Sequence, residues 1–224
     1  MNRYEVALEV ASPAAMFTRP DTGSTPISYP VPTFSAAKGM FEAVVWLPHA
    51  YIQPTKVEVC RPIQFQRYVT NYGGPLRKQD QIKKKASYQL IATILVDVCY
   101  RIYGEVHVKK TSSRGMDDPR RRKRRGTKDY HEIVRNRFNE RLEKGQTYYT
   151  PCLGWKEFVP NYFGPLREET KRDMTVDNIV IPSFLRSMWE HRRLKPEYIQ
   201  NWHIVRGVMS YSRQIPMEEG LNVE

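Results

Sequence analysis

A proline-rich stretch that leads into a short amphipathic segment constrains this chain most. Residues 17–46 read FTRPDTGSTPISYPVPTFSAAKGMFEAVVW. Proline fixes its own φ and keeps the preceding residue extended, so Tyr29 and Val31 are expected to be extended. Thr33 is then placed to cap a helix. The apolar side of this predicted helix carries Phe34, Ala37, Phe41, Val44 and Val45.

Two alternating segments flank this predicted helix. In residues 3–11, Tyr4, Val6, Leu8 and Val10 share one face, and Arg3, Glu5 and Glu9 share the other, which is typical of a half-buried strand. Residues 55–65 alternate again, and Pro62 indicates that this strand ends there or lies at an edge. Strand, helix and strand form the first half of a ferredoxin-like fold, so we expect an α+β fold with an antiparallel sheet.

The remaining chain gives weaker signals. The polar, Gly-containing residues 67–87 indicate a loop or an irregular excursion. Residues 90–108 alternate for so long that a bend or hairpin is expected near residues 95–97. Helices are predicted from Asp129 to Lys144 and over residues 183–193, and a strand over residues 204–211. The residues from Pro216 are acidic and expected to be frayed. We interpret residues 1–160 as one domain and residues 161–224 as a smaller C-terminal extension packed on it.

The charge balance favours a polyanionic partner. The chain has 36 Lys and Arg against 24 Asp and Glu, for a net charge of +12, with 14 Tyr and 4 Trp available to stack on bases. Residues 109–128 hold ten basic and two acidic residues, which gives +8 of that charge. So dense a run repels itself, and we expect a flexible basic insertion that orders on RNA by binding phosphates.

Other residue types narrow the class of protein. The three cysteines are odd in number and widely spaced, so neither a disulfide framework nor a metal site is expected, and a reducing cytoplasm is the predicted location. No apolar run of membrane-spanning length and no signal peptide is apparent. No carboxylate cluster that would hold Mg²⁺ stands out, which argues against a metal-dependent nuclease, and no cofactor is expected.

His131 falls in the first turn of the helix predicted after the basic insertion. The free N–H groups and the dipole of a helix N-terminus favour an anion there, so a phosphate beside His131 would be attracted. RNA can be cut without a metal ion when a base takes the proton of the 2′-hydroxyl and a cation stabilises the phosphorane. A surface histidine without a role is an equal alternative on spacing alone.

The motifs resemble those of a known family. FTRP with SYPVPTFSAAKGMFEAVVW, then VEVCRPIQF, DVCYRIYGEVHV and GQTYYTPCLGWKEF, are similar to CRISPR-associated proteins of Cas family five, type I-C subtype, in the RAMP superfamily. The resemblance covers about two thirds of the chain. It implies a ferredoxin-like RAMP domain and a metal-independent endoribonuclease that cuts the CRISPR precursor transcript and then stays on the 5′ handle of the CRISPR RNA. The implied partners are the backbone and large subunits of a Cascade complex and, indirectly, target DNA.

The resemblance also implies a site. The family has a Lys-His pair near the start of the helix before the GQ signature, and Lys128 and His131 correspond to it. The family also has a tyrosine at the end of the first helix. Val45 occupies that position here, so Tyr130 or Tyr51 would have to replace the tyrosine. The residues expected to bind RNA are Arg19, Tyr29, Lys38, Lys109, Lys110, Arg120, Arg121, Arg122, Lys123, Arg124, Arg125, Trp155 and Lys156.

A second hypothesis is a non-catalytic RNA-binding scaffold subunit. Val45 favours it, because valine cannot transfer a proton. A DNA-binding protein of another class is a distant third, since no helix-turn-helix or zinc spacing is present.

Overall fold

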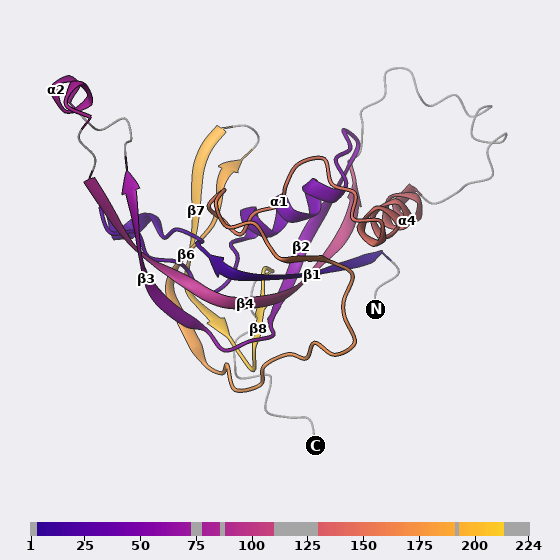
Figure 1. The fold of residues 1–224 in the computed structure, drawn as a ribbon. Helices are drawn as coiled ribbons and strands as arrows, with labels where there is room; N and C mark the ends of the chain where they lie inside the picture. Colours follow the sequence, from indigo (N-terminus) through magenta and orange to yellow (C-terminus); the bar gives the residue numbers. More distant parts are fainter. Residues whose placement is uncertain (1–3, 73–77, 86–87, 110–129, 191–192, 213–224) are drawn as a thin grey trace.

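The computed structural model describes residues 4–72, 78–85, 88–109, 130–190 and 193–212 (Figure 1). In chain order its elements are β1 (Glu5–Ala15), the 3-10 turn η1 (Pro20–Thr22), α1 (Phe34–Val44), β2 (Ala50–Val59), β3 (Gln64–Tyr72), α2 (Gln79–Lys83), β4 (Tyr88–Val108), α4 (Tyr130–Glu143), β5 (Tyr162–Gly164), β6 (Ile179–Glu190), β7 (Arg193–Ile204) and β8 (Val208–Ser210).

An antiparallel sheet forms the body of the molecule. Its strands lie in the order β5-β1-β4-β2-β8, and β3 also pairs with β4. β4 therefore lies between β1 and β2, the two strands that α1 connects, which is the split arrangement of a ferredoxin-like fold. The expected α+β fold with an antiparallel sheet is confirmed.

The long central strand β4 runs through the place where a bend or hairpin was expected. Its first part pairs with β3 as far as Val96, and its last part pairs with β2 from Tyr100 onward. Between them, Asp97 adopts a φ of 51°, and the strand curves strongly there (Figure 1). The expected bend is thus present as an irregularity within one strand, and the hairpin is not, because both parts share β1 as a neighbour.

The helix α1 forms where the proline-rich stretch predicts it. The Thr33 hydroxyl accepts a hydrogen bond from the Ala36 N–H, which confirms the expected N-cap. Phe41 is fully buried and contacts Phe138 of α4 with ring centroids 5.6 Å apart. Gly104 of β4 leaves room for this contact, because a Cβ at residue 104 would lie 2.9 Å from the Phe41 ring. Both helices thus pack on the sheet through the same aromatic pair.

Glu9 was expected on the solvent side of β1, and this expectation is wrong. Its neighbours Leu8 and Val10 are fully buried, as the alternation predicts, but Glu9 is also 0% exposed. The reason is that the segment after β5 crosses the other face of the sheet, where Arg167 and Thr170 bind the carboxylate. This face of the sheet is therefore also covered around Glu9.

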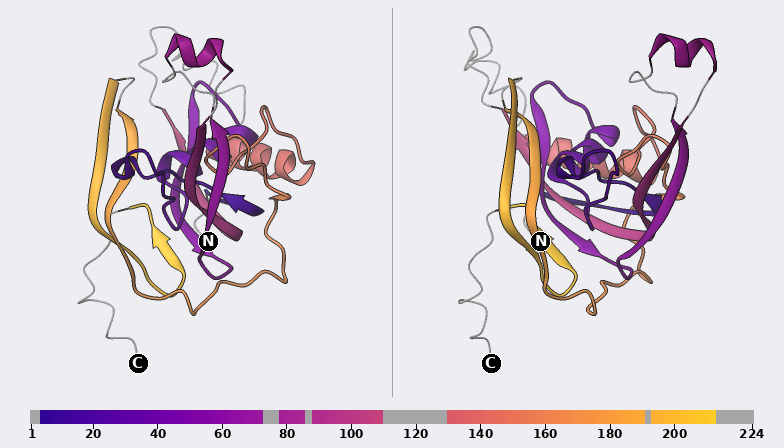
Figure 2. Two further views of the ribbon diagram at one scale, coloured as in Figure 1. Left: turned by 60° about the vertical axis from the view of Figure 1, so that its left-hand side comes forward. Right: turned by 90° about the vertical axis from the view of Figure 1, so that its left-hand side faces the viewer.

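The expected helix over residues 183–193 is also wrong, because this segment belongs to the β6–β7 hairpin. Phe184, Leu185 and Met188 have helical spacing in the sequence. However, the register shifts after Leu185 and again after Ser187, and each irregularity blurs the alternation that would have identified a strand. In the right view of Figure 2, this hairpin and the β3–β4 end stand on opposite sides of the molecule.

Residues 67–87 were expected to form a loop or an irregular excursion, but most of those that the structure describes belong to regular elements. β3 continues to Tyr72, and the short helix α2 follows. The strand is polar because it is exposed and pairs only with β4, so its composition resembles that of a loop.

The C-terminal part of the chain completes the edges of the sheet. β5 pairs with β1 and β8 pairs with β2, and a turn at Arg206 and Gly207 interrupts the strand expected over residues 204–211. The boundary at residue 160 stays a prediction, and the residues from Pro216 lie outside the described part. Among the helices of the described residues, none is long and apolar enough to cross a membrane.

Candidate nucleic-acid interface

The candidate site lies where the chain leaves β4 and returns into α4. Lys109 follows β4 directly and is exposed, and Tyr130 begins α4. The expected basic insertion between them, with Lys110, the run from Arg120 to Arg125 and Lys128, falls outside the described residues, as does Asp129. The residues that flank the insertion, Lys109 and Tyr130, nevertheless show that it connects the end of β4 to the start of α4.

His131 lies in the first turn of α4, as the sequence predicts. Its ring faces Tyr4 with centroids 4.7 Å apart and planes tilted by 30°. The buried residues Val134, Phe138 and Leu142 hold the helix on the sheet, so the orientation of its first turn is fixed. Tyr130, the residue before His131, is 41% exposed. A phosphate at this end of α4 would meet backbone N–H groups of the first turn and an imidazole.

Val45 stands where the resemblance to Cas family five implies a tyrosine. It ends α1 and is only 7% exposed, and its N–H donates to the Phe41 carbonyl. An apolar side chain in this place contributes packing and no proton transfer. The next residue, Trp46, is 61% exposed and offers an indole surface instead.

Tyr29 was expected to contact RNA, and its position in the structure contradicts this. It is 1% exposed, its hydroxyl donates to the Ser183 carbonyl, and it accepts a hydrogen bond from the Leu185 N–H. Burial raises the pKa of this hydroxyl. The side chain turns inward because β6 provides partners for its hydroxyl and Phe184 packs against its ring.

Arg19 and Lys38, the other candidates in this segment, remain accessible. Arg19 forms two hydrogen bonds with Asp21, and these lower the pKa of that carboxyl group. Lys38 projects from α1, with its ammonium group 3.6 Å from the Glu42 carboxylate. Both cations are therefore paired with carboxylates that are at least partly accessible, and a phosphate could replace these carboxylates as the partner at small cost.

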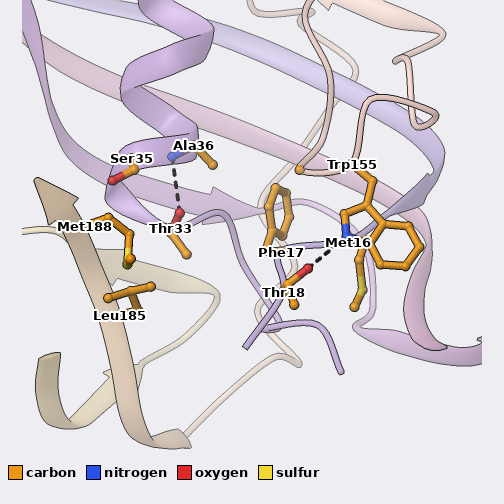
Figure 3. A pocket seen from close by; sticks show the side chains of 10 residues that line it. Met16, Phe17, Thr18, Thr33, Ser35, Ala36, Trp155, Leu185 and Met188 are labelled. Carbon is orange, nitrogen blue, oxygen red and sulfur yellow. Dashed lines mark hydrogen bonds between the residues drawn. The ribbon is translucent and has the colours of Figure 1, made fainter. Parts of the chain in front are cut away.

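Trp155 lies near the start of α1, at a cavity of about 220 Å³ (Figure 3). The Trp155 Nε1–H donates to the Thr18 hydroxyl at 2.9 Å, and the indole stacks on Phe158 with centroids 6.0 Å apart. Lys156, the next residue, is exposed. The cavity is lined by Met16, Phe17, Thr18, Thr33, Ser35, Ala36, Gly154, Trp155, Leu185 and Met188.

One group of residues was only partly identified from the sequence. Tyr51 of β2 lies directly opposite His107 of β4, and their rings stack with centroids 5.4 Å apart and planes within 15°. The ammonium groups of Lys38 and Lys109 each lie 6.0 Å from the centre of the Tyr51 ring. Tyr51 was considered as a proton donor, but His107 was missed because only the strand register brings it there.

The side chains that bind metal ions in proteins are dispersed in the described part of the chain. Within those ranges, no three His, Cys, Asp or Glu side chains gather closely enough to form a metal site. The candidate interface thus consists of aromatic rings, imidazoles and cations.

Comparison with known proteins identifies the family. The family model described as CRISPR-associated protein (Cas_Cas5), Cas5d, matches residues 5–214. The chain belongs to the Cas5 family of CRISPR-associated proteins. The resemblance to its type I-C subtype is confirmed, since two relatives carry the Cas5d name.

Both of these Cas5 relatives are named CRISPR pre-crRNA endoribonuclease Cas5d. The protein of Mannheimia succiniciproducens is 31% identical over 172 residues, which cover 70% of this chain and 71% of the relative. The protein of Thermus thermophilus is 32% identical over 152 residues, which cover 67% of this chain and 59% of the relative. The match thus spans less than two thirds of the Thermus protein.

Solved structures show the same fold at low sequence identity. A CRISPR-associated protein superposes with a TM-score of 0.64 at 20% identity, covering 94% of this chain and 92% of its own. A functionally uncharacterized protein from Streptococcus mutans superposes with a TM-score of 0.62 at 17% identity, and the match covers 93% of this chain and 92% of that protein. A chain of a CRISPR RNA-guided surveillance complex superposes with a TM-score of 0.52 at 13% identity, and the match covers 92% of this chain and 90% of that chain. The expected ferredoxin-like RAMP fold of a Cas5 protein is confirmed.

Proposed function

We propose that this Cas5 protein cleaves the CRISPR precursor RNA as a metal-independent endoribonuclease and then holds the 5′ handle of the product. The observation that carries the proposal is the position of His131 in the first turn of α4, directly after the basic insertion, in a chain whose relatives are named pre-crRNA endoribonucleases. The insertion brings the phosphates of the RNA to this helix terminus, where His131 can act on one of them.

The reaction needs only proton transfer and cations. His131 takes the proton of the 2′-hydroxyl, the 2′-oxygen forms a bond to phosphorus, and the bond from phosphorus to the 5′-oxygen breaks. The leaving oxygen receives a proton, for which Tyr130 is the neighbouring candidate, and the product keeps a 2′,3′-cyclic phosphate. His131 is assigned as the base because it lies at the helix terminus where a phosphate would bind. Lys128 is proposed to stabilise the charge of the phosphorane.

The proposal is tested with the purified chain and its repeat RNA in EDTA. The unmutated protein should cut the RNA and leave the cyclic phosphate. His131→Ala should reduce the cleavage rate about a hundred- to ten-thousand-fold and leave RNA affinity nearly unchanged. His49→Ala, which removes an exposed histidine before β2, is the matched control and should cut normally. Undiminished cleavage by His131→Ala would reject the assignment.

A second candidate function is that of a non-catalytic scaffold within a surveillance complex. Buried Val45 favours it, because the family tyrosine is absent from the end of α1. In this case the chain holds the 5′ handle and contacts the backbone and large subunits, and it meets target DNA only through them. If the unmutated protein binds the repeat RNA tightly but does not cut it in EDTA or with added Mg²⁺, the scaffold function is correct.

A further inference from the structure

Four residues that are distant in the sequence converge at the end of β4 just before the basic insertion. Lys38 comes from α1, Tyr51 from the start of β2 and His107 from the end of β4, and Lys109 directly follows β4. We infer that these four residues form a platform on which one unpaired base of the RNA stacks while its phosphates bind the lysines. The inference rests on the proposed function and adds a substrate-binding site to it.

The two rings have the geometry of a stacking surface. Tyr51 and His107 are a directly opposed antiparallel pair, so their side chains share a face of the sheet. The rings lie 5.4 Å apart with planes within 15°, and the His107 side chain is 40% exposed. A base can therefore extend an existing stack. Every base has a π-face, so such a platform accepts any sequence.

Backbone pairing makes the platform rigid. The Lys109 N–H donates to the His49 carbonyl at 2.9 Å, so the chain stays attached to β2 for one residue beyond β4. The Lys109 ammonium group reaches the Pro48 carbonyl at 3.4 Å. A platform that is already ordered loses little conformational entropy when RNA binds.

The charges around the two rings indicate which residues of the platform attract phosphate and which ones stack on the base. Glu42 lies 3.6 Å from the Lys38 ammonium group and offsets its charge locally, whereas Glu105 lies 3.9 Å from His107 Nε2. Stacking is thus the main contribution of the rings. The attraction for phosphate comes from Lys109, which is the first residue of the +8 run.

Two substitutions at Tyr51 separate stacking from chemistry of the hydroxyl group. Tyr51→Ala should weaken binding of the repeat RNA about 10- to 100-fold, because it removes one of the two rings that form the stack. Tyr51→Phe keeps the ring and should bind like the unmutated chain. His107→Ala, at a side chain that is 40% exposed, provides a second test in case Tyr51→Ala does not fold. Tyr198→Ala removes a 46% exposed ring from β7 and is the control, for which no change is expected.

Salt dependence distinguishes the rings from the lysines. Tyr51→Ala should leave the slope of log affinity against log salt unchanged, since stacking releases no counterions, whereas Lys109→Ala should reduce it by about 0.7. Affinity is measured by fluorescence anisotropy of labelled repeat RNA, and folding by circular dichroism.

Different outcomes separate this inference from the proposed function. Reduced affinity with an unchanged cleavage rate at saturating RNA supports the platform. Unchanged affinity in both Tyr51→Ala and His107→Ala overturns it while leaving the endoribonuclease proposal intact. If Tyr51→Phe loses affinity as Tyr51→Ala does, the hydroxyl group and not the ring binds the RNA, and the stacking role is wrong. If the unmutated chain binds RNA without cutting it, the enzyme proposal fails. The RNA affinities of the Tyr51 and His107 variants still show in that case whether the platform binds RNA.

Discussion

Glu9 carries a carboxylate in the middle of β1, where it is fully buried. The Arg167 guanidinium lies 2.6 Å away, the Thr170 hydroxyl donates at 2.7 Å, and the Arg167 backbone N–H donates at 3.0 Å. Burial raises the pKa of Glu9, but these hydrogen bonds and the positive charge of Arg167 outweigh it and hold the pKa below its ordinary value. The folded chain therefore favours the ionised carboxylate more than the unfolded chain does.

Glu9→Gln should lower the free energy of unfolding at neutral pH by about 3 kcal/mol, because it leaves the guanidinium groups around it without their counter-charge. The stability that ionised Glu9 provides is present above its unfolded pKa of about 4.3 and is lost as the pH falls through the folded pKa. The difference between variant and parent should thus shrink in acid. Urea unfolding at neutral and acidic pH measures it. Glu140→Gln, at an exposed partner of Lys144, is the control, and an equal destabilisation there would contradict the prediction.

Gly154 allows a close backbone approach next to the cavity. Its φ is +87°, and an added Cβ would lie 1.8 Å from the Met16 carbonyl oxygen. Gly154→Ala should therefore lower the midpoint of thermal unfolding strongly, because the backbone at residues 16 and 154 must separate. Gly39→Ala is the matched control, since the space there is open and alanine stabilises a helix by up to about 1 kcal/mol. Similar effects of the two substitutions would contradict this account.

At the scale of elements, Tyr29 connects the proline-rich stretch to the β6–β7 hairpin. Tyr29→Phe removes both hydrogen bonds of the hydroxyl and should lower the free energy of unfolding by about 2 kcal/mol, because the Ser183 carbonyl and the Leu185 N–H are left without their partner. RNA affinity should not change. Tyr149→Phe is the control, since that half-exposed hydroxyl bonds only to the Gly39 carbonyl. Weaker RNA binding by Tyr29→Phe, with stability unchanged, would restore its expected role in RNA binding.

The elements also show which parts of the fold a sequence can predict. α1 could be predicted because its cap and its apolar face are local features. β6 could not, since its conformation depends on pairing with β7, and two register shifts obscure its alternation. The same contrast holds in the candidate site. His131 follows from the start of one helix, whereas the contact of Tyr51 with His107 depends on the register of two strands and on the irregularity between Pro54 and Lys56.

At the scale of the whole molecule, the fold collects its RNA-binding candidates at two places. Tyr51 at the start of β2, Lys109 just after β4 and His131 at the start of α4 form one place, and the cavity with Trp155 at the start of α1 is the other. α1 spans about 16 Å between them, which is the length of a few extended nucleotides. An RNA strand along α1 could contact both places, with the basic insertion as a third contact.

The last prediction concerns that basic insertion, which holds +8 of the net charge of +12. Replacing Arg120, Arg121, Arg122, Lys123, Arg124 and Arg125 with serine should weaken binding of the repeat RNA. It should also reduce the slope of log affinity against log salt, by about 0.7 for each phosphate that the protein no longer neutralises. Binding should persist, because Lys38, Lys109 and Lys156 are unchanged.

The control for this prediction replaces Lys83, Lys84 and Lys85 with serine, at and beyond the end of α2. It also lowers the net charge but lies away from the start of α4 (Figure 1), so it should reduce the salt slope much less. Anisotropy titrations over a range of salt concentrations measure both variants. An unchanged slope in the insertion variant would mean that these residues do not contact phosphates. If the slope falls in both variants in proportion to the number of cations removed, RNA binding depends on the total charge of the protein. Local contacts with phosphates would instead make the slope depend on which cations are removed.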